Sequence, residues 1–264
     1  MRIKFIYYGI LVVFIKSCAV KIGEKKIRIL TMTSHERNRA VSFFRKEPET
    51  LRWIDSFKAQ AGGDQPAFVF FDIGANIGIY SMYAAVKYPK AKVISFEPES
   101  QSFSSLCKNA SSNDLVNINP YQFAISDNTG IGKIWVSLMS AGAGAASLGG
   151  EYELMKKKNN TIFHQGVYYA SIDDLVFNSN FPFPAFIKVD VDGIEGAILS
   201  GARRVMNDDR FKSLLVEIQF KAEGDVSLID KPLRAMGLRL LEKSEWTSFA
   251  NGFYSRNFIY GKVA

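Results

Sequence analysis

A glycine-containing turn between a predicted strand and a predicted helix constrains the fold of this chain more than any other feature. Residues 71–78 read FDIGANIG and follow an apolar run at 68–71 that is typical of a buried parallel strand. A helix is predicted over residues 77–88. Gly74 allows the backbone to turn sharply and leaves room for a ligand, and Gly78 allows the helix to pack close to the strand. We expect the N–H groups at the start of this helix to be free to bind a carboxylate.

Predicted strands and helices alternate through the rest of the chain. Beyond the first strand, β-type runs occur at 92–96, 116–123, 186–191, 214–218 and 258–262. Helical patterns occur at 77–88, 100–110 and 194–206. Such alternation predicts right-handed crossovers and a doubly wound α/β fold, with a mostly parallel sheet and helices on both of its faces.

A smaller region precedes this domain. We predict a short strand at 25–33, a helix at 47–59 and a turn-rich break at 61–66. The predicted organisation is therefore an N-terminal strand and helix extension at 21–66, followed by the main domain at 67–264.

An apolar segment occupies residues 1–20. Within it, residues 5–15 form an apolar run of 11 residues that is interrupted only by Gly9. A membrane span needs about 20 such residues, whereas the apolar part of a signal peptide needs about 7–15. We favour a packed helix or a surface anchor that makes peripheral membrane contact, with a signal peptide as the alternative.

Residues 137–150, which read SLMSAGAGAASLGG, contain too much glycine, alanine and serine for a fixed core position. This stretch is predicted to be a loop. It either closes over a ligand or serves as a plain flexible connection.

Two acidic residues end consecutive predicted strands. Asp72 ends the first strand, and Glu97 ends the second, about 20 residues after the glycine turn, where an acid can accept hydrogen bonds from both ribose hydroxyls of a nucleotide. Asn76 and the missing third glycine depart from the dinucleotide pattern G-x-G-x-x-G, so pyrophosphate binding is disfavoured. S-adenosylmethionine has no pyrophosphate, and its cationic part suits Asp72. These residues indicate S-adenosylmethionine as the cofactor.

A third strand-to-helix junction, FIKVDVDGIE at 186–195, brings three carboxylates close to one strand end. Asp192 and Glu195 have the spacing of a capping box, so one interpretation is that this pair only starts the helix. Asp190 is expected at the carboxyl edge of the strand, where open α/β sheets bind their ligands.

Composition excludes several other classes of protein. The net charge is +7, but the basic residues are scattered, and the run Lys156-Lys157-Lys158 is typical of a solvated loop, so no nucleic-acid partner is expected. Two cysteines are too few for a disulfide framework or a zinc site. Two histidines disfavour both a histidine-based metal centre and a Ser-His-Asp triad.

The chain resembles the FkbM family of S-adenosylmethionine-dependent methyltransferases from about Lys25 to the C-terminus. The matching pieces, in chain order, are Arg39-Ala40, EPET at 47–50, FDIGANIGIYS at 71–81, FEPE at 96–99, AISD at 124–127, SIDDL at 171–175, IKVDVDGIEGAIL at 187–199 and LLVEI at 214–218. The resemblance implies a Rossmann-like, class I methyltransferase fold with seven strands. Two departures are Gly196, where a larger residue is expected near the acceptor pocket, and Asp192, where many members carry glutamate.

The resemblance also implies roles for individual residues. Asp72, Gly74, Asn76 and Gly78 would line the methionine part of the cofactor, and Glu97 would hold the ribose. The adenine would lie near Ala124, Ser126 and Asp127, and Asp190 would face the sulfonium and the acceptor. The predicted cofactor-binding set is completed by neighbours within the same motifs, namely Ala75, Tyr80, Ser81 and Pro98.

O-methylation of a small-molecule or glycan hydroxyl is the activity that the family resemblance implies. A hydroxyl acceptor needs help to lose its proton, so Asp190 and Asp192 are the candidate catalytic residues. No metal site is predicted, although Asp190, Asp192 and Glu217 offer oxygen ligands that suit Mg²⁺. A cofactor made and used in the cytosol favours a cytoplasmic protein, and the sequence carries no indication of the oligomeric state.

Two alternatives stand beside this prediction, and a third activity is disfavoured. One is a non-catalytic module that binds a nucleoside or a glycan on the same fold. Another is an NAD-linked oxidoreductase, because Tyr152 and Lys156 have the Tyr-x-x-x-Lys spacing of many short-chain dehydrogenases. Amino-group methylation is disfavoured, because Asp190-Val191-Asp192-Gly193 stands where such enzymes carry an Asn/Asp-Pro-Pro-Tyr/Phe turn, and Asn119-Pro120-Tyr121 falls on an earlier strand.

Overall fold

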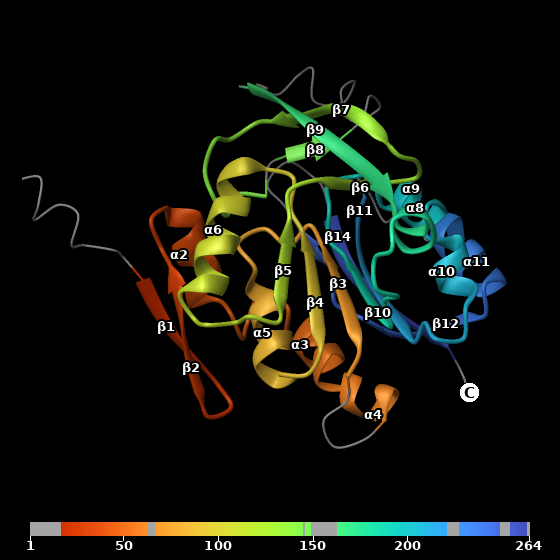
Figure 1. The fold of residues 1–264 in the computed structure, drawn as a ribbon, viewed down its shortest axis with the longest axis horizontal. Coiled ribbons are helices and arrows are strands. Elements are labelled where there is room, and N and C mark those ends of the chain that lie inside the picture. The colour runs from red at the N-terminus through yellow and green to blue at the C-terminus, as the bar shows by residue number, and fades with distance from the viewer. Residues whose placement is uncertain are drawn as a thin grey trace, which may run out of the picture.

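The computed structural model describes residues 17–62, 67–144, 146–148, 163–220, 227–248 and 254–262. A large sheet with the strand order β12-β14-β11-β10-β3-β4-β5 lies at its centre, and a short strand, β13, pairs with β14 (Figure 1). Its strands are β3 (Val69–Ile73), β4 (Lys92–Phe96), β5 (Ile118–Tyr121), β10 (Phe186–Val189), β11 (Ser213–Phe220), β12 (Leu238–Lys243), β13 (Thr247–Ser248) and β14 (Tyr254–Lys262).

The sheet is mostly parallel, as predicted. Strands β5, β4, β3, β10 and β11 run in the same direction, whereas β14 is antiparallel to both β11 and β12. Strand β3 lies between β4 and β10, so the strand order reverses at β3. In doubly wound sheets such a switch point opens a crevice at the carboxyl ends of the strands. The glycine turn follows β3 and therefore opens onto this crevice.

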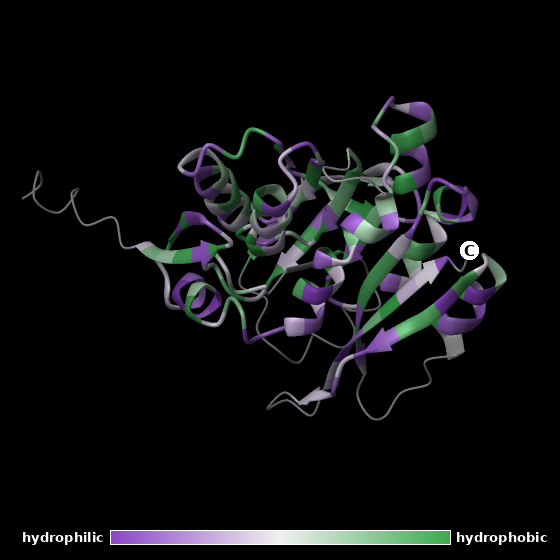
Figure 2. Ribbon diagram, turned by 90° about the horizontal axis from the view of Figure 1, so that it is seen from below, coloured by the Kyte–Doolittle hydropathy of each residue, from purple (hydrophilic) through white to green (hydrophobic). Residues whose placement is uncertain are grey.

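Helices cover both faces of the sheet (Figure 1). One face carries α3 (Pro48–Asp55), α4 (Phe57–Ala61), α5 (Ile79–Lys87) and α6 (Ser100–Ser111), and the other carries α8 (Ile172–Asn178), α9 (Glu195–Ser200), α10 (Arg203–Asn207) and α11 (Ser227–Ala235). Consecutive strand residues point to opposite faces. Phe70 accordingly belongs to the core under α3 and α5, and Phe71 belongs to the core under α8 and α9. Figure 2 shows hydrophobic residues gathered along the central strands.

The N-terminal extension begins with a hairpin of β1 (Ser17–Ile22) and β2 (Lys25–Leu30), followed by α2 (Ser34–Val41). Strand β1 starts inside the segment that the sequence analysis set at 1–20, and residues 1–16 lie outside the described residues. Helix α2 begins with a capping box of Thr33 and Glu36. Among the described residues, no helix is long and apolar enough to cross a membrane.

Two predicted helices are each divided in the structure. The helix predicted at 47–59 breaks at Ser56, whose hydroxyl donates to the carbonyl of Trp53 at 2.6 Å. The helix predicted at 194–206 breaks after α9, at Gly201. A Cβ at Gly201 would lie 2.4 Å from the carbonyl oxygen of Ser126. The tight packing of this turn against the neighbouring strand therefore interrupts the helix.

A second sheet was not predicted from the sequence. It has the order β6-β9-β7-β8 and consists of β6 (Ala124–Ser126), β7 (Gly130–Val136), β8 (Ala146–Leu148) and β9 (Phe163–Ser171). Strand β8 lies within the stretch that was predicted to be a loop, 137–150. This sheet stands beside the carboxyl ends of the central strands (Figure 1) and contributes to the wall of the site described next.

Candidate functional site

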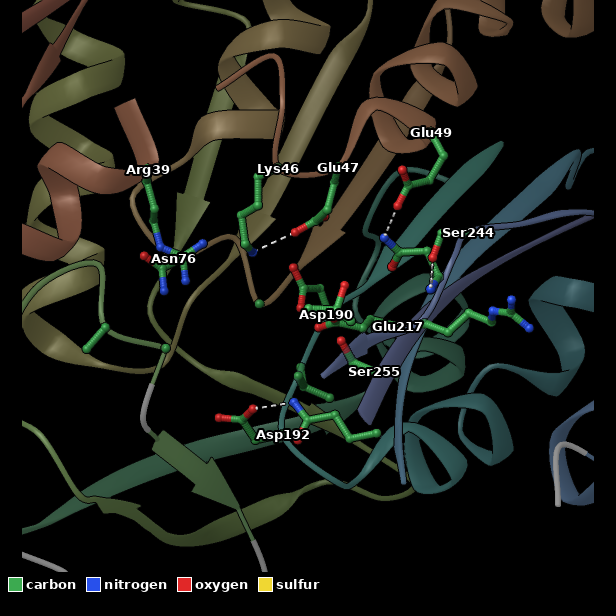
Figure 3. Close-up of a pocket in the computed structure, with 18 of the residues that line it drawn as sticks. Arg39, Lys46, Glu47, Glu49, Asn76, Asp190, Asp192, Glu217, Ser244 and Ser255 are labelled. Atoms are coloured by element: carbon green, nitrogen blue, oxygen red, sulfur yellow. Dashed lines mark hydrogen bonds and ion pairs between the residues drawn. The ribbon is translucent and has the colours of Figure 1, made fainter. Parts of the chain in front are cut away.

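A cavity of about 690 Å³ opens at the carboxyl ends of the central strands (Figure 3). The ends of β3, β4, β10 and β11 form its floor, and α3, the segment before it and the C-terminal strands form its walls. A smaller cavity of about 40 Å³ adjoins it, and the two share Gly74, Pro98, Val191 and Asp192 in their linings. The site therefore lies at the switch point of the sheet, as the sequence analysis predicted.

The glycine turn packs directly against the end of β10. Gly74 has a φ of 75°, and a Cβ there would lie 1.9 Å from the carbonyl oxygen of Asp190. Only glycine fits this position, because the close approach is made by backbone atoms. Gly78 has a φ of 86°, and a Cβ there would lie 2.4 Å from Leu106 of α6. The sharp turn was predicted. The two segments that these glycines allow to approach closely, the end of β10 and helix α6, were not.

The backbone N–H groups of this turn already have partners within the chain. Gly74 and Ala75 donate to the carbonyl of Phe96, and Gly78 donates to that of Ala75. Asn76, in the left-handed region with a φ of 53°, donates its N–H to Glu97 at 2.8 Å, and its side-chain oxygen accepts from Ile77. The N–H groups of residues 74–78 are therefore not free, and binding of a carboxylate at the helix start, which lies at Ile79, stays a prediction.

Glu97 joins the ends of β3 and β4. Its carboxylate accepts from the backbone N–H of Asn76 at 2.8 Å and from that of Glu99 at 2.9 Å. Glu97 is 7% exposed and lines the large cavity. Burial raises its pKa to about 7, although the two N–H donors oppose the rise. A carboxylate has about four lone-pair sites, so Glu97 can still accept hydrogen bonds from a ligand.

Asp72, Tyr80 and Ser81 are buried behind the cavity wall. Asp72 accepts a hydrogen bond of 2.5 Å from the hydroxyl of Ser81, and its other oxygen lies 4.0 Å from the ammonium of Lys188. The Tyr80 ring lies 4.8 Å from the same ammonium. In this structure the three side chains lie in the interior next to the glycine turn, so their predicted contact with the cofactor stays a prediction. The same holds for Ala75, which is 6% exposed.

Asp190 and Glu217 lie on the cavity floor and form a cluster with Lys188, which is buried. Lys188 is 1% exposed and donates to Asp190 at 2.7 Å. Burial alone would raise the pKa of Asp190, but the Lys188 ammonium and a hydrogen bond from Glu217 hold it below its usual value. Burial and the negative charge of Asp190 raise the pKa of Glu217 well above its ordinary value. Of this pair, Asp190 is therefore the carboxyl that ionises more readily, and Glu217 is the one that holds its proton more strongly.

Asp192 faces both cavities and does not cap the following helix. The N-cap residue of α9 is Ile194, without a side-chain hydrogen bond, and Asp192 instead accepts from the side chain of Gln219 at 2.9 Å. Glu195 accepts from the N–H of Gly193, and burial raises its pKa to about 7. Of the two interpretations of this acidic pair, the structure favours a place for Asp192 in the site.

The small cavity is apolar where the adenine was predicted to bind. Ala124 lines it together with Phe123, Ile125 and Ile194. The backbone of Ser126 and Asp127 packs against the turn at Gly201, and the predicted place of these residues near the adenine stays a prediction. Gly196, the departure noted in the sequence, is exposed on α9, with open space where its Cβ would be.

Several residues that line the large cavity had no predicted role. Arg39, Lys46, Glu47 and Glu49 come from the N-terminal extension, and Ser255, Arg256 and Asn257 come from β14. The first group lies within or beside the motifs that carry the family resemblance, so their position was a usable signal. Lys188 had a signal of its own, since a lysine inside a buried apolar strand needs a charged partner. The residues of β14 follow no recognisable pattern.

The described residues contain no group of three His, Cys, Asp or Glu side chains arranged to hold a metal. The suggested Mg²⁺ ligands are engaged with protein partners, because Asp190 pairs with Lys188 and Glu217, and Asp192 accepts from Gln219. Tyr152 and Lys156, the pair that motivated the oxidoreductase alternative, lie outside the described residues. The Asn119-Pro120-Tyr121 sequence lies on β5, as predicted.

Residues 72–240 match the Methyltransferase FkbM domain family. The chain belongs to this family. A hexuronic acid methyltransferase from Haloferax volcanii is 29% identical over 150 residues, which cover 57% of the chain and 55% of the relative. The 31-O-demethyl-FK506 methyltransferase of Streptomyces tacrolimicus is 36% identical over 67 residues, which cover 25% of each protein. The matches thus span from a quarter to about half the length of these two relatives.

The fold is also that of known methyltransferases. The magnesium protoporphyrin IX methyltransferase of Synechocystis PCC 6803, solved with bound S-adenosylmethionine, superposes with a TM-score of 0.50. The alignment covers 88% of this chain and 86% of that one, at 14% sequence identity. This likeness confirms the predicted class I methyltransferase architecture.

Proposed function

We propose that this methyltransferase moves a methyl group from S-adenosylmethionine to a hydroxyl of a sugar or of a similarly polar metabolite. The observation that carries the proposal is the position of Asp190. Its ionised carboxylate lies on the cavity floor, between the glycine turn on one side and the polar walls of α3 and β14 on the other. A hydroxyl beside Asp190 would thus lie between a cofactor pocket and an acceptor pocket.

The residues at the glycine turn fit S-adenosylmethionine. Glu97 presents a buried carboxylate to two ribose hydroxyls, and the apolar cavity at Ala124 suits an adenine ring. The acidic groups at Asp190 and Asp192 favour a nearby positive charge, such as a sulfonium. The cavity volume of about 690 Å³ lies within the usual range of about 300–1,000 Å³ for small-molecule sites. The fit supports this cofactor.

The acceptor end of the cavity is polar on several sides. Asn257, 4% exposed, donates to Glu49 at 2.7 Å, while its side-chain oxygen has no hydrogen-bond partner among the described residues. Ser244 and Ser255 line the same wall (Figure 3). A buried acceptor atom without a partner costs free energy, which a hydroxyl group of a bound molecule would recover. The walls therefore favour a polyhydroxylated acceptor over an apolar one.

The relatives point to the same chemistry. One is named for a hexuronic acid, and the other for 31-O-demethyl-FK506. Both names are compatible with transfer to oxygen. A sugar acceptor agrees with the first name and with the polar wall around Asn257 and Glu49.

The catalytic work assigned to the protein is alignment and proton acceptance. S-adenosylmethionine supplies an activated methyl group when it is bound. Asp190 accepts a hydrogen bond from the acceptor hydroxyl, directs an oxygen lone pair at the methyl carbon, and receives the proton as the oxygen loses it. Lys188 keeps Asp190 ionised and so able to accept the hydrogen bond from the hydroxyl, although the same contact weakens Asp190 as a base, and Asp192 is the other candidate for receiving the proton.

A transfer assay with S-adenosylmethionine carrying a tritiated methyl group tests the proposal. The probes are methyl β-D-glucopyranoside, methyl β-D-glucuronide and, as an apolar alcohol, cyclohexanol. We expect label in one or both sugars and none in cyclohexanol. Transfer to cyclohexanol alone would contradict the polar acceptor. Cofactor binding without transfer to any probe or to a cell-extract glycan fraction would favour the non-catalytic module.

A further inference from the structure

We propose that Arg39 binds the α-carboxylate of the cofactor's methionine part, and so forms an anion subsite that the N-terminal extension supplies. The inference rests on the proposed cofactor. Arg39 belongs to α2 and precedes the matched domain at 72–240, although Arg39-Ala40 is among the pieces that carry the sequence resemblance. It lines the large cavity and lies beside Asn76 of the glycine turn (Figure 3).

The hydrogen bonds within the glycine turn explain why an anionic ligand group needs a cationic side chain here. The backbone N–H groups of residues 74–78 donate to Phe96, Glu97, Ala75 and the Asn76 side chain. A carboxylate at the turn cannot take these donors without breaking bonds within the protein. An anion desolvated in this cavity requires a counter-charge, and an arginine offers two parallel N–H donors that match a carboxylate.

The guanidinium of Arg39 is held in place by a hydrogen bond from its Nε. Its Nε donates to the carbonyl of Gly142 at 2.6 Å, and within the described residues its two Nη nitrogens form no hydrogen bond, so they are available on the cavity side. A Cβ at Gly144 would lie 3.0 Å from Nη2 of Arg39 and 3.6 Å from Nδ2 of Asn76. Donors from α2 and from the glycine turn therefore converge on one side of the cavity.

The loop that holds Arg39 is itself fixed. Thr33 donates its hydroxyl to the carbonyl of Ala141 at 2.7 Å, and the N–H of Gly142 donates to Ser102 at 3.3 Å. Gly142 has a φ of 85°, and a Cβ there would lie 2.9 Å from the backbone nitrogen of Glu36. The start of α2 and this loop thus position the guanidinium before any ligand arrives, which lowers the entropic cost of binding.

Of the other cations at the cavity, Lys243 and Arg256 belong to β12 and β14, on the acceptor wall, and three more are paired. Lys46 donates to Glu47 at 2.6 Å, Arg52 pairs with Glu242 on the rim, and Lys188 is buried between two aspartates. Within the described part of the chain, Arg39 forms no ion pair. Its charge nevertheless acts on Glu97, where it opposes the rise in pKa that burial causes. Arg39 is therefore the cation at the cofactor end that is available to an incoming carboxylate.

Calorimetric titration with two ligands tests the subsite. S-adenosylmethionine carries the carboxylate, and decarboxylated S-adenosylmethionine lacks only that group. Arg39→Gln is expected to weaken binding of the first about 10-fold to 100-fold and to leave binding of the second unchanged. Arg39→Lys should retain part of the preference for the carboxylate. The control is Arg37→Gln, which removes an exposed arginine from the same helix and should change neither affinity.

The other possible results of the titration contradict either the role of Arg39 or the proposed cofactor, and they can be told apart. Equal weakening of both ligands by Arg39→Gln would overturn the inference, because Arg39 would then act only by holding the Gly142 loop. Unchanged affinity for S-adenosylmethionine would overturn it as well. Failure of the unmodified protein to bind either ligand would instead refute the proposed cofactor. Circular dichroism of each variant shows whether it is folded.

Discussion

Lys188 donates a hydrogen bond of 2.7 Å to Asp190 from a position inside the central sheet, where its side chain is 1% exposed. Asp72, on the adjacent strand β3, lies 4.0 Å from the same ammonium. A buried lysine without partners would lose its proton, but these two carboxylates raise the pKa of Lys188 above its usual value. The cluster joins the end of β3 to the end of β10, so it ties the glycine turn to the proposed catalytic carboxylate.

Replacement of Lys188 by methionine should destabilise the protein. The substitution keeps most of the side-chain volume but leaves Asp72 and Asp190 without their buried counter-charge. Loss of one partner of a buried pair costs about 3–5 kcal/mol. Urea denaturation at pH 7 measures the change. Lys92→Met, at an exposed position on β4, is the matched control, and an equal effect of both substitutions would contradict the assigned role of Lys188.

Asp190→Asn and Asp192→Asn should separate the two candidate catalytic residues. If Asp190 receives the hydroxyl proton, its replacement should lower kcat about 100-fold to 10,000-fold. Asp192 already accepts from Gln219, so Asp192→Asn should have a smaller effect on kcat. Steady-state rates with the sugar acceptor found by the transfer assay provide the comparison, at a temperature where both variants are folded. A larger loss in Asp192→Asn would reverse the assignment.

Binding of the adenosine part should strengthen as the pH rises through about 7, the pKa of Glu97. Only the ionised carboxylate accepts hydrogen bonds from both ribose hydroxyls, so the binding-competent form is lost below that pH. Between pH 8 and pH 6 the affinity should fall by up to about tenfold. Titration with 5′-methylthioadenosine isolates this effect, because that ligand has no amino-acid group. Glu97→Gln should bind weakly at every pH, and a retained pH dependence in this variant would assign the titration to another group.

The fold followed from the sequence because local patterns determine it. The apolar run before Gly74, the acid after β4 and the alternation of strands with helices each depend on neighbouring residues, and the structure places them as predicted. The antiparallel partners were not predicted. Strand β14 inserts between β11 and β12 through long-range pairing that no short pattern encodes.

The site was only partly predictable for a related reason. The residues at the strand ends, Gly74, Glu97, Asp190 and Asp192, line the cavity. Asp72 and Ser81 share a motif with Gly74, but their side chains point to the interior, which depends on the strand pleat and on Lys188. Arg39 and Asn257 reach the cavity from opposite ends of the chain. Only tertiary packing brings them there.

Two glycines should respond in opposite ways to alanine. Gly74→Ala places a Cβ against the carbonyl of Asp190 at a position with positive φ, and it should cost at least about 3 kcal/mol of stability and reduce cofactor binding. Gly196→Ala meets open space within α9 and should raise stability by about 0.4–1 kcal/mol. Thermal unfolding of both variants checks the pair. A stable Gly74→Ala that binds S-adenosylmethionine normally would show that the contact with β10 is dispensable.

Glu195→Gln should stabilise the protein at alkaline pH more than at acidic pH. Burial raises the pKa of Glu195 from its ordinary value of 4.5 to about 7, so between these values the folded state holds a proton that the unfolded state has released. This carboxyl therefore favours folding below about pH 4.5, and that advantage is lost as the pH rises through about 7. A glutamine oxygen still accepts from the N–H of Gly193 but carries no charge to bury. We expect a gain of up to about 3 kcal/mol at pH 8 and little change at pH 5, measured as unfolding free energies in urea.

Asp209→Asn, at a fully exposed position, should show no such difference between the two pH values. A gain in Glu195→Gln that is equal at pH 5 and pH 8 would mean that Glu195 does not titrate in this range.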